Sequence, residues 1–306
     1  MLVFVYPDQE NREELLALCP ENEAGDHARA MIENLLLEEE EYDIAVCFCY
    51  GTFVLRRFYE GYEFTYPLVL EEGADVEKTL VALEEYSKRY EIPLVFADLT
   101  REEQGILARR YRYTRSEEFD VADEGEDPFV IYRLFVMSPC ETLDTPPTVS
   151  DGEVTLSPLT KEDIPSYATL CRDEEILAVW GTDYREIDPD MSDGDFYENA
   201  RFEFESGIAL TLAIRVGGRL IGEATLYAFD GRGGAEFSLR ILRGYRNNGY
   251  GTRALLLLFQ VAREELGLDF VDGICLSENL PSIALMQTHM RFEEETEGKR
   301  RYRKML

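Results

Sequence analysis

The residues best suited to chemistry lie between Arg240 and Leu258, where two glycines precede an amphipathic run. Gly249 and Gly251 can adopt backbone angles closed to other residues and bring amide N–H groups close to a ligand. The helix expected after them directs the positive end of its dipole at the same place. A strand over 235–242 followed by this turn and helix therefore predicts an anion site that fits a pyrophosphate.

The spacing of these residues excludes two common phosphate loops, because neither G-x-G-x-x-G nor G-K-[ST] is present. The spacing R-x-x-G-x-G instead resembles the acyl-CoA loop of the Gcn5-related N-acetyltransferase (GNAT) superfamily. The resemblance implies acetyl-CoA as co-substrate, with backbone amides on its pyrophosphate and pantetheine and an arginine adding charge. The residues implied are Arg240, Ile241, Leu242, Arg246, Asn247, Asn248, Gly249, Tyr250, Gly251 and Thr252. The alternative is an ordinary glycine turn before a surface helix.

A second signature follows at Asn279, Ser282 and Leu285, which is similar to the superfamily's N-x-x-S-x-x-L element. The resemblance implies that Asn279 contacts the pantetheine arm and that Ser282 lies in the first turn of the next helix. The alternative is plain helix capping, since Asn followed by Pro281 is a good helix start.

For proton transfer the candidate base is Glu236, a place where related enzymes often carry a catalytic glutamate. Strand alternation puts Glu236, Ser238 and Arg240 on one face. The alternatives are a solvated glutamate or a partner for Arg240. Many members carry a tyrosine where this chain has Met286, and a thioether has no proton to give. Water, Ser238 or another tyrosine must then protonate the leaving thiolate.

The chain has 306 residues and a formal net charge of −31. The first 150 residues hold 34 acidic and 13 basic side chains, whereas residues 239–306 hold 9 acidic and 11 basic ones. The segment expected to hold a polyanion is thus the least acidic part. The strongly negative net charge repels phosphate backbones, so no nucleic-acid partner is expected. A cationic small molecule or peptide becomes more plausible, although solubility alone is the better explanation of the charge.

The six cysteines are scattered without the paired spacings of a zinc site, and they indicate reduced thiols. The amino terminus has no basic leader, and no apolar run reaches the roughly 20 residues of a spanning helix. These features predict a cytoplasmic protein without a membrane partner and without a metal.

Three prolines and a glycine between Ser138 and Gly152 mark a domain boundary. We expect a first domain over 1–140, a linker over 141–152 and a second domain over 153–306. The second half alternates strands and helices in the order of a complete GNAT domain, with strands expected at 153–159, 210–216, 220–229, 235–242, 270–276 and 300–306. The fold class is α/β (α+β), with two tandem GNAT-like domains, each a mixed, mostly antiparallel sheet flanked by helices.

The first half is also similar to the degenerate first GNAT-like half of phosphatidylglycerol lysyltransferase and Fem-type tandem proteins. Where a cofactor loop would lie, residues 71–77 carry four carboxylates, which repel phosphate. The first domain is therefore expected to bind no CoA and to be structural or to shape a substrate cleft.

The main hypothesis is an N-acetyltransferase that transfers acetyl directly to a primary amine of a small molecule or a protein. The carboxylate-rich segment from Trp180 to Asp195 suits a cationic amine, although a solvated loop with Trp180 docked into the core is the better explanation. The alternative is a catalytically inactive CoA-binding or interaction module, which Met286 favours. Aminoacyl-tRNA-dependent transfer is a third reading, which the net charge opposes. The sequence leaves open whether the protein is a homodimer.

Overall fold

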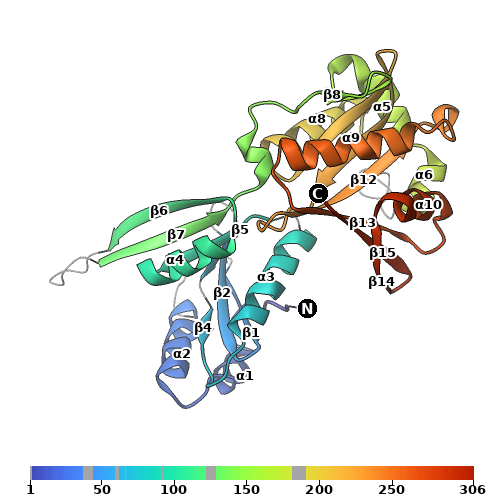
Figure 1. Ribbon diagram of the computed structural model, residues 1–306. Helices are drawn as coiled ribbons and strands as arrows, with labels where there is room; N and C mark the ends of the chain where they lie inside the picture. The colour runs from blue at the N-terminus through green and yellow to red at the C-terminus, as the bar shows by residue number, and fades with distance from the viewer. Residues whose placement is uncertain are drawn as a thin grey trace. The chain divides into compact units, whose positions relative to one another are not determined.

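The computed structural model describes residues 2–36, 44–58, 62–65, 67–90, 92–121, 129–180 and 191–306. The chain forms two units, Met1–Met137 and Ser138–Leu306, each with its own sheet and core (Figure 1). The expected linker, 141–152, and the three residues before it belong to the second unit. This part contains the 3-10 turn η1 (Pro139–Thr142) and strand β8 (Val149–Ser150), and Cys140, expected in the first domain, is buried in the core of the second unit.

The C-terminal unit is built on an eight-stranded sheet of order β14-β15-β13-β12-β11-β10-β9-β8. Its strands are β9 (Val154–Pro158), β10 (Ala209–Val216), β11 (Arg219–Tyr227), β12 (Gly234–Ile241), β13 (Phe270–Leu276), β14 (Arg291–Thr296) and β15 (Lys299–Met305). The neighbours are antiparallel except for β12 and β13, which are parallel. The expected hairpin is confirmed: Gly217 and Gly218 both have positive φ, as its two-residue turn requires.

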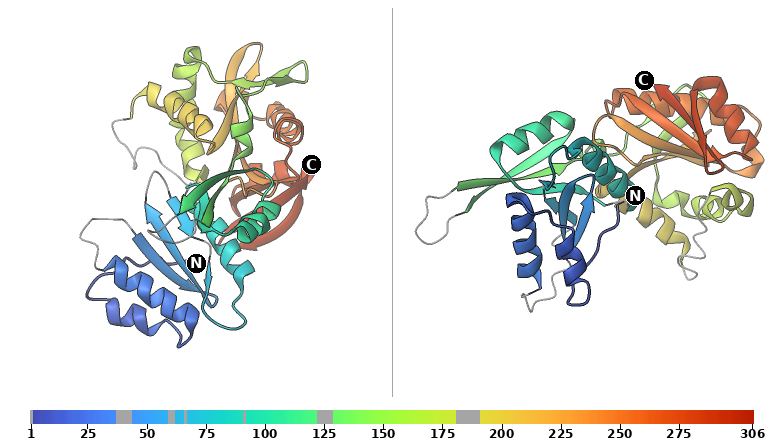
Figure 2. Two further views of the ribbon diagram at one scale, coloured as in Figure 1. Left: turned by 90° about the vertical axis from the view of Figure 1, so that its left-hand side faces the viewer. Right: turned by 90° about the horizontal axis from the view of Figure 1, so that it is seen from below.

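Helices cover both faces of this sheet (Figures 1 and 2). Its helices are α5 (Ile164–Cys171), α6 (Glu174–Trp180), α8 (Asp193–Glu205), α9 (Tyr250–Glu264) and α10 (Leu280–His289). Phe237 and Tyr302 belong to the core under α9 and α10, which includes Leu258 and Met286. Ala213 belongs to a second core with α5 and α8 on the opposite face. The predicted alternation of β12 therefore holds, because its apolar side chains lie under α9.

Strands β12 and β13 separate along their length. Their pairing begins at Gly234–Phe270 and ends at Phe237–Gly273, although β12 continues to Ile241 and β13 to Leu276. Beyond Phe237 the β13-facing edge of β12 thus has no strand partner within the described residues. A wedge with backbone hydrogen-bonding groups on its sides opens there.

The N-terminal unit has strands β1 (Ile44–Cys49), β2 (Thr52–Phe58), β3 (Tyr62–Thr65), β4 (Leu68–Val69), β5 (Leu94–Leu99), β6 (Thr114–Val121) and β7 (Phe129–Val136). Its helices are α1 (Arg12–Ala17), α2 (Glu23–Leu35), α3 (Val76–Tyr90) and α4 (Arg101–Arg110). The sheet order is β1-β2-β3-β5-β7-β6, with β4 paired to β2 and with only β3 and β5 parallel. Order and directions coincide with those of β10-β11-β12-β13-β15-β14.

Candidate active site

The turn between β12 and α9 forms the start of an anion site. After Ile241 the chain passes through the 3-10 turn η3 (Arg243–Tyr245), and α9 begins at Tyr250. Gly249 is its N-cap at φ +79°, and a Cβ there would meet nothing within 4 Å. The glycine is therefore required by backbone conformation rather than by crowding.

Gly251 differs from its expected role. It lies in the first turn of α9, has no positive φ, and an added Cβ would meet only Leu239, at 3.8 Å. Because Gly251 has no side chain, it leaves the backbone at the start of α9 uncovered. The amides of Tyr250, Gly251 and Thr252 lie in the first turn, where N–H groups lack intrahelical acceptors. These donors and the helix dipole suit an anion.

The side chain of Arg246 does not extend freely into this site, contrary to expectation. Its Nε donates to the carbonyl of Ile241 at 2.9 Å, and its other nitrogens lie 3.1 Å from Asp173 and 2.9 Å from Glu175. Arg243 lies 3.2 Å from the same Glu175. The two loop arginines are thus tied to carboxylates at the start of α6. Asn248 likewise folds back, donating to the carbonyls of Tyr245 and Arg246.

The backbone of the residues at the open end of β12 is only partly available. Arg240 and Ile241 lie on the separated part of the strand, whereas Leu242 already donates its N–H to Ile221 at 2.8 Å. The Arg240 side chain is buried on the α5 face, 2.6 Å from Glu223 and 3.1 Å from the Sγ of Cys171. Burial raises the pKa of the Cys171 thiol to about 12, so this thiol stays protonated.

Glu236 lies on the α5 face of β12, just before the strands separate. It is half-buried and stands beside Tyr227 of β11 and Asp272 of β13. Ser238, also half-buried, follows on the same face at the level of the open wedge. The structure therefore brings the two expected catalytic residues to the mouth of the wedge.

Asn279 and Ser282 make the capping contact that was the alternative to cofactor binding. Asn279 is the N-cap of α10, and its Oδ1 accepts the N–H of Ser282 at 3.2 Å. Met286 is buried at the closed end of the wedge, where a Cβ on Gly273 would lie 2.4 Å from its sulfur and 2.6 Å from Phe237. His289 is the last residue of α10, a favourable place for a partial positive charge.

Asp272 is a site residue that sequence reasoning missed. Its side chain is buried, and Arg303 binds it through two contacts of 2.7 Å, with Arg301 at 3.3 Å. The alternation of Arg301 and Arg303 on a terminal strand was the available signal, but it did not indicate their common partner.

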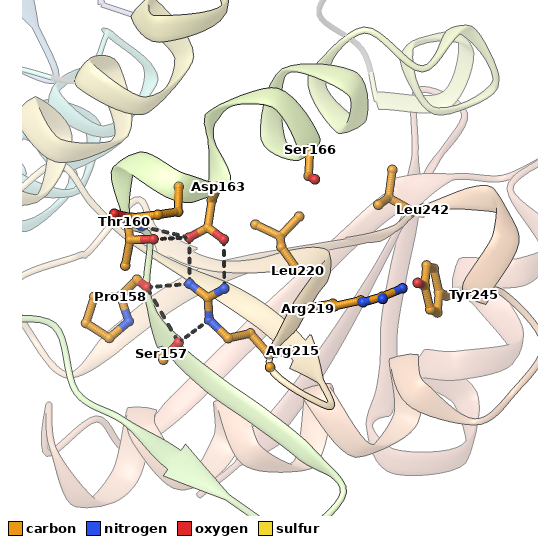
Figure 3. A pocket seen from close by; sticks show the side chains of 12 residues that line it. Ser157, Pro158, Thr160, Asp163, Ser166, Arg215, Arg219, Leu220, Leu242 and Tyr245 are labelled. Atoms are coloured by element: carbon orange, nitrogen blue, oxygen red, sulfur yellow. Dashed lines mark hydrogen bonds and ion pairs between the residues drawn. The ribbon is translucent and has the colours of Figure 1, made fainter.

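A surface pocket of about 780 Å³ borders the turn between β12 and α9, which we call the anion loop (Figure 3). Leu242 and Tyr245 belong to its wall, and Figure 3 shows Arg219 reaching toward Tyr245. On the far wall Arg215 is held by Asp163 through contacts of 2.7 and 2.6 Å. The Arg215 hydrogen bonds keep the pKa of Asp163 below its usual value despite burial, which raises it.

Two kinds of site are absent from the described residues. No group of three or more His, Cys, Asp or Glu side chains there could hold a metal ion. No described helix is long and apolar enough to cross a membrane.

Residues 153–289 match the model of the acetyltransferase (GNAT) domain family. This part of the chain is therefore a GNAT acetyltransferase domain. The match covers β9 to α10, the elements that form the wedge and the anion loop.

Several solved structures are similar in fold to about half of the chain. A putative ribosomal-protein-serine acetyltransferase from Vibrio cholerae is 18% identical, with a TM-score of 0.44, over 53% of this chain and 99% of that one. A ribosomal L7/L12 alpha-N-protein acetyltransferase in complex with coenzyme A is 14% identical, with a TM-score of 0.45, over 52% and 98%. A spermidine N-acetyltransferase from Vibrio cholerae, solved with CoA and spermine, is 17% identical, with a TM-score of 0.42, over 51% and 96%.

Proposed function

We propose that this protein transfers an acetyl group directly from acetyl-CoA to a primary amine. The observation that carries the proposal is the wedge that opens after Phe237–Gly273 beside the N-terminus of α9, within the matched acetyltransferase domain. The wedge offers an extended ligand strand-like backbone partners, and the helix start offers an anion donors at one end.

The residues present fit acetyl-CoA. The amides of 249–252 would hold its pyrophosphate, and the space beside Gly249 is open, since a side chain there would meet no other part of the protein within 4 Å. Arg240 and Ile241 present backbone groups to the pantetheine arm. Arg246 contributes once it leaves Asp173 and Glu175. Asn279 and Ser282 shape the opposite side through the start of α10.

When bound, acetyl-CoA supplies an acyl group whose C–S bond breaks as the new N–C bond forms. Glu236 accepts the proton that the ammonium of the acceptor must lose, directly or through water. Ser238 or water relays to the leaving thiolate the second proton, which the nitrogen loses once the N–C bond has formed. Met286 occupies the place of the usual tyrosine and takes no part in proton transfer. Its bulk closes the inner end of the wedge against Phe237 and Gly273.

The acceptor is an amine of a small molecule or of a protein, and its cationic form is drawn to the carboxylates of this acidic chain. Of the segment expected to favour a cationic amine, Trp180 to Asp195, residues 181–190 lie outside the described residues. We also propose a cytoplasmic protein with neither nucleic-acid nor membrane partners, and the net charge of −31 supports the exclusion of nucleic acid. All six cysteines are free, as a reducing compartment requires. A homodimer remains compatible with these features.

We also propose that the N-terminal unit is a degenerate GNAT-like domain. Its strand order and directions, which match those of the C-terminal unit, support this relation. Its α3 is preceded by Glu71, Glu72 and Asp75, and Asp75 already accepts the N–H of Lys78 at the helix start. A carboxylate thus takes the place of an anion there, which supports a structural role without CoA.

Calorimetric titration of acetyl-CoA into the parent, Gly249→Asp and Gly249→Asn tests the function. Asp and Asn have similar size and both tolerate positive φ, so the pair isolates the effect of charge beside the pyrophosphate. We expect micromolar binding by the parent, near-parent binding by G249N, and at least tenfold weaker binding by G249D. Equal affinities of the two variants would exclude the loop as the phosphate site.

A catalytically inactive CoA-binding module is the second candidate, and Met286 at the closed end of the wedge favours it. It predicts acetyl-CoA binding without CoA release on a broad panel of primary amines. Turnover of any amine by the parent would exclude it.

A further inference from the structure

A row of charged side chains crosses three strands beside the expected base. The register pairs Glu236 of β12 with Asp272 of β13, and Asp272 with Arg303 of β15. Cross-strand partners share a face, so these side chains point to the α5 side of the sheet. Helix α5 packs on β11 and α8 on β10, so both lie to one side of this row. Arg301 and Arg303 keep 36% and 34% of their side-chain surface exposed.

Arg303 is held rigidly in this row. Its Nε and Nη2 each lie 2.7 Å from one oxygen of Asp272, and its guanidinium lies 4.0 Å from the centre of the Phe270 ring. The bidentate pair fixes the plane of the guanidinium, and the ring supports its face. The Arg303 guanidinium is therefore held in one position before any ligand binds.

Arg301 adds a second positive charge to the same carboxylate. Its Nη1 lies 3.3 Å from Asp272, and its Nε lies 3.4 Å from the exposed Glu294. One bidentate arginine would already neutralise Asp272. Glu294 balances the second guanidinium, so the two arginines offer an anion partly exposed N–H donors near Glu236 rather than an excess of positive charge.

The spacing of the row limits what can bridge it. Neighbouring strands lie about 4.8 Å apart, so the Cα of Arg303, on the second strand from β12, lies roughly 10 Å from that of Glu236. The Arg303 and Arg301 side chains contact Asp272 on the strand between. An ammonium group at Glu236 and an anion at the guanidinium groups would then be separated by only a few bonds. A carboxylate matches the planar guanidinium in shape and charge.

We propose that the acceptor is a small amino acid-like molecule, whose amine is placed at Glu236 while Arg303, with Arg301, binds its carboxylate. The inference deepens the proposed function, on which the position of the amine rests. It replaces a purely cationic acceptor with a zwitterionic one. Asp272 is a positioning residue that fixes the arginines and does not touch the acceptor.

The test is calorimetric binding, in the presence of CoA, of glycine, β-alanine and γ-aminobutyrate, each against its amide. We expect at least one acid to bind about tenfold more tightly than its amide, the factor of one charge-assisted hydrogen bond. Arg303→Met should abolish this ratio. Arg263→Met, an exposed arginine of α9, is the matched control and should keep it.

A folding control separates loss of recognition from loss of structure. Asp272→Asn/Arg303→Met removes the buried charge together with its partner, so it should fold, as judged by its thermal melt, and still lack the ratio. Equal binding of every acid and amide by the parent overturns the inference, as does a ratio that survives in either folded variant. A parent that binds acetyl-CoA without preferring acids keeps the proposed function and loses this inference. A parent that prefers acids but does not bind acetyl-CoA keeps the carboxylate site at Arg303 and loses the proposed acetyl transfer.

Discussion

The Nη2 atom of Arg246 lies 3.1 Å from Oδ2 of Asp173, and this contact ties the anion loop to the junction of α5 and α6. Asp173 is largely buried, with 17% of its side chain exposed, whereas Arg246 has 31% exposed. A pyrophosphate at the start of α9 therefore meets an arginine that is already engaged by a carboxylate.

Removal of this carboxylate should strengthen cofactor binding. In Asp173→Asn a negative charge near the loop is lost, and Arg246 is then held only by Glu175 and the carbonyl of Ile241. We expect the Kd for acetyl-CoA to fall about threefold to tenfold at low salt, and less at high salt because exposed charges are screened. Titration calorimetry at two ionic strengths measures this. Glu198→Gln on α8 is the control and should change nothing. Weaker binding by D173N would show that the contact orders the loop for the cofactor.

The proposed base makes a separate prediction for the chemical step. Glu236→Gln keeps the size of the side chain and removes its ability to take a proton. We expect kcat/KM for the best amine to fall by about 10²- to 10⁴-fold, the usual range for a general base, while acetyl-CoA affinity stays within twofold. Release of the CoA thiol monitors the rate. Glu198→Gln on α8, an exposed carboxylate paired with Arg201, is the control. Unchanged turnover in E236Q would remove Glu236 from the mechanism.

Much of the C-terminal unit could be predicted because its strands alternate and its turns carry glycine. The hairpin at Gly217–Gly218 and the strand–turn–helix around Gly249 were expected at nearly their observed positions. Strand β14 was missed, since all six of its residues are exposed and four are charged, so no apolar period marks it. The partners of Arg246 and Arg303 were also hidden. These partners are Asp173 and Asp272, which lie close to the two arginines only in the folded structure.

The buried pair of Arg240 and Glu223 predicts a large effect on stability. Their side chains are 4% and 3% exposed and lie 2.6 Å apart. Glu223→Ala leaves the guanidinium buried without this carboxylate, which costs about 3–5 kcal/mol in the free energy of unfolding. Urea denaturation measures the change. Glu198→Ala, which breaks an exposed pair with Arg201, should cost at most about 1 kcal/mol. Similar losses in both variants would contradict the assigned importance of burial.

The thiols should differ in reactivity. Hydrogen bonding by Cys47, then by Thr52 and Thr79, outweighs burial and lowers the pKa of Cys49 to about 6. Burial raises the pKa of Cys140 to about 12. Cys49 becomes the reactive thiolate as the pH rises through this lowered pKa. Alkylation of Cys49 by iodoacetamide should therefore increase between pH 5 and 7 and then level off, as read by mass spectrometry of peptides. Cys140 should stay unmodified over the same range. Thr52→Val and Thr79→Val should each move the Cys49 midpoint upward, and a midpoint near pH 8.5 in the parent would refute the assignment.

Variants of Asn279, at the start of α10, distinguish a structural role of this residue from a role in cofactor binding. Its Oδ1 accepts the N–H of Ser282, and Pro281 occupies the first turn, as expected of a helix start. Asn279→Ala removes the cap and should cost about 1 kcal/mol in the free energy of unfolding, whereas Asn279→Asp keeps an acceptor and should cost little. Acetyl-CoA affinity then decides the role. If Asn279 acts by capping alone, N279D binds acetyl-CoA as the parent does, and any loss in N279A follows its loss of stability. If its amide N–H₂ also donates to the pantetheine arm, N279D loses that donor and binds several-fold more weakly while remaining fully stable. Urea unfolding and calorimetry on the two variants therefore distinguish a helix that merely borders the wedge from one that holds its ligand.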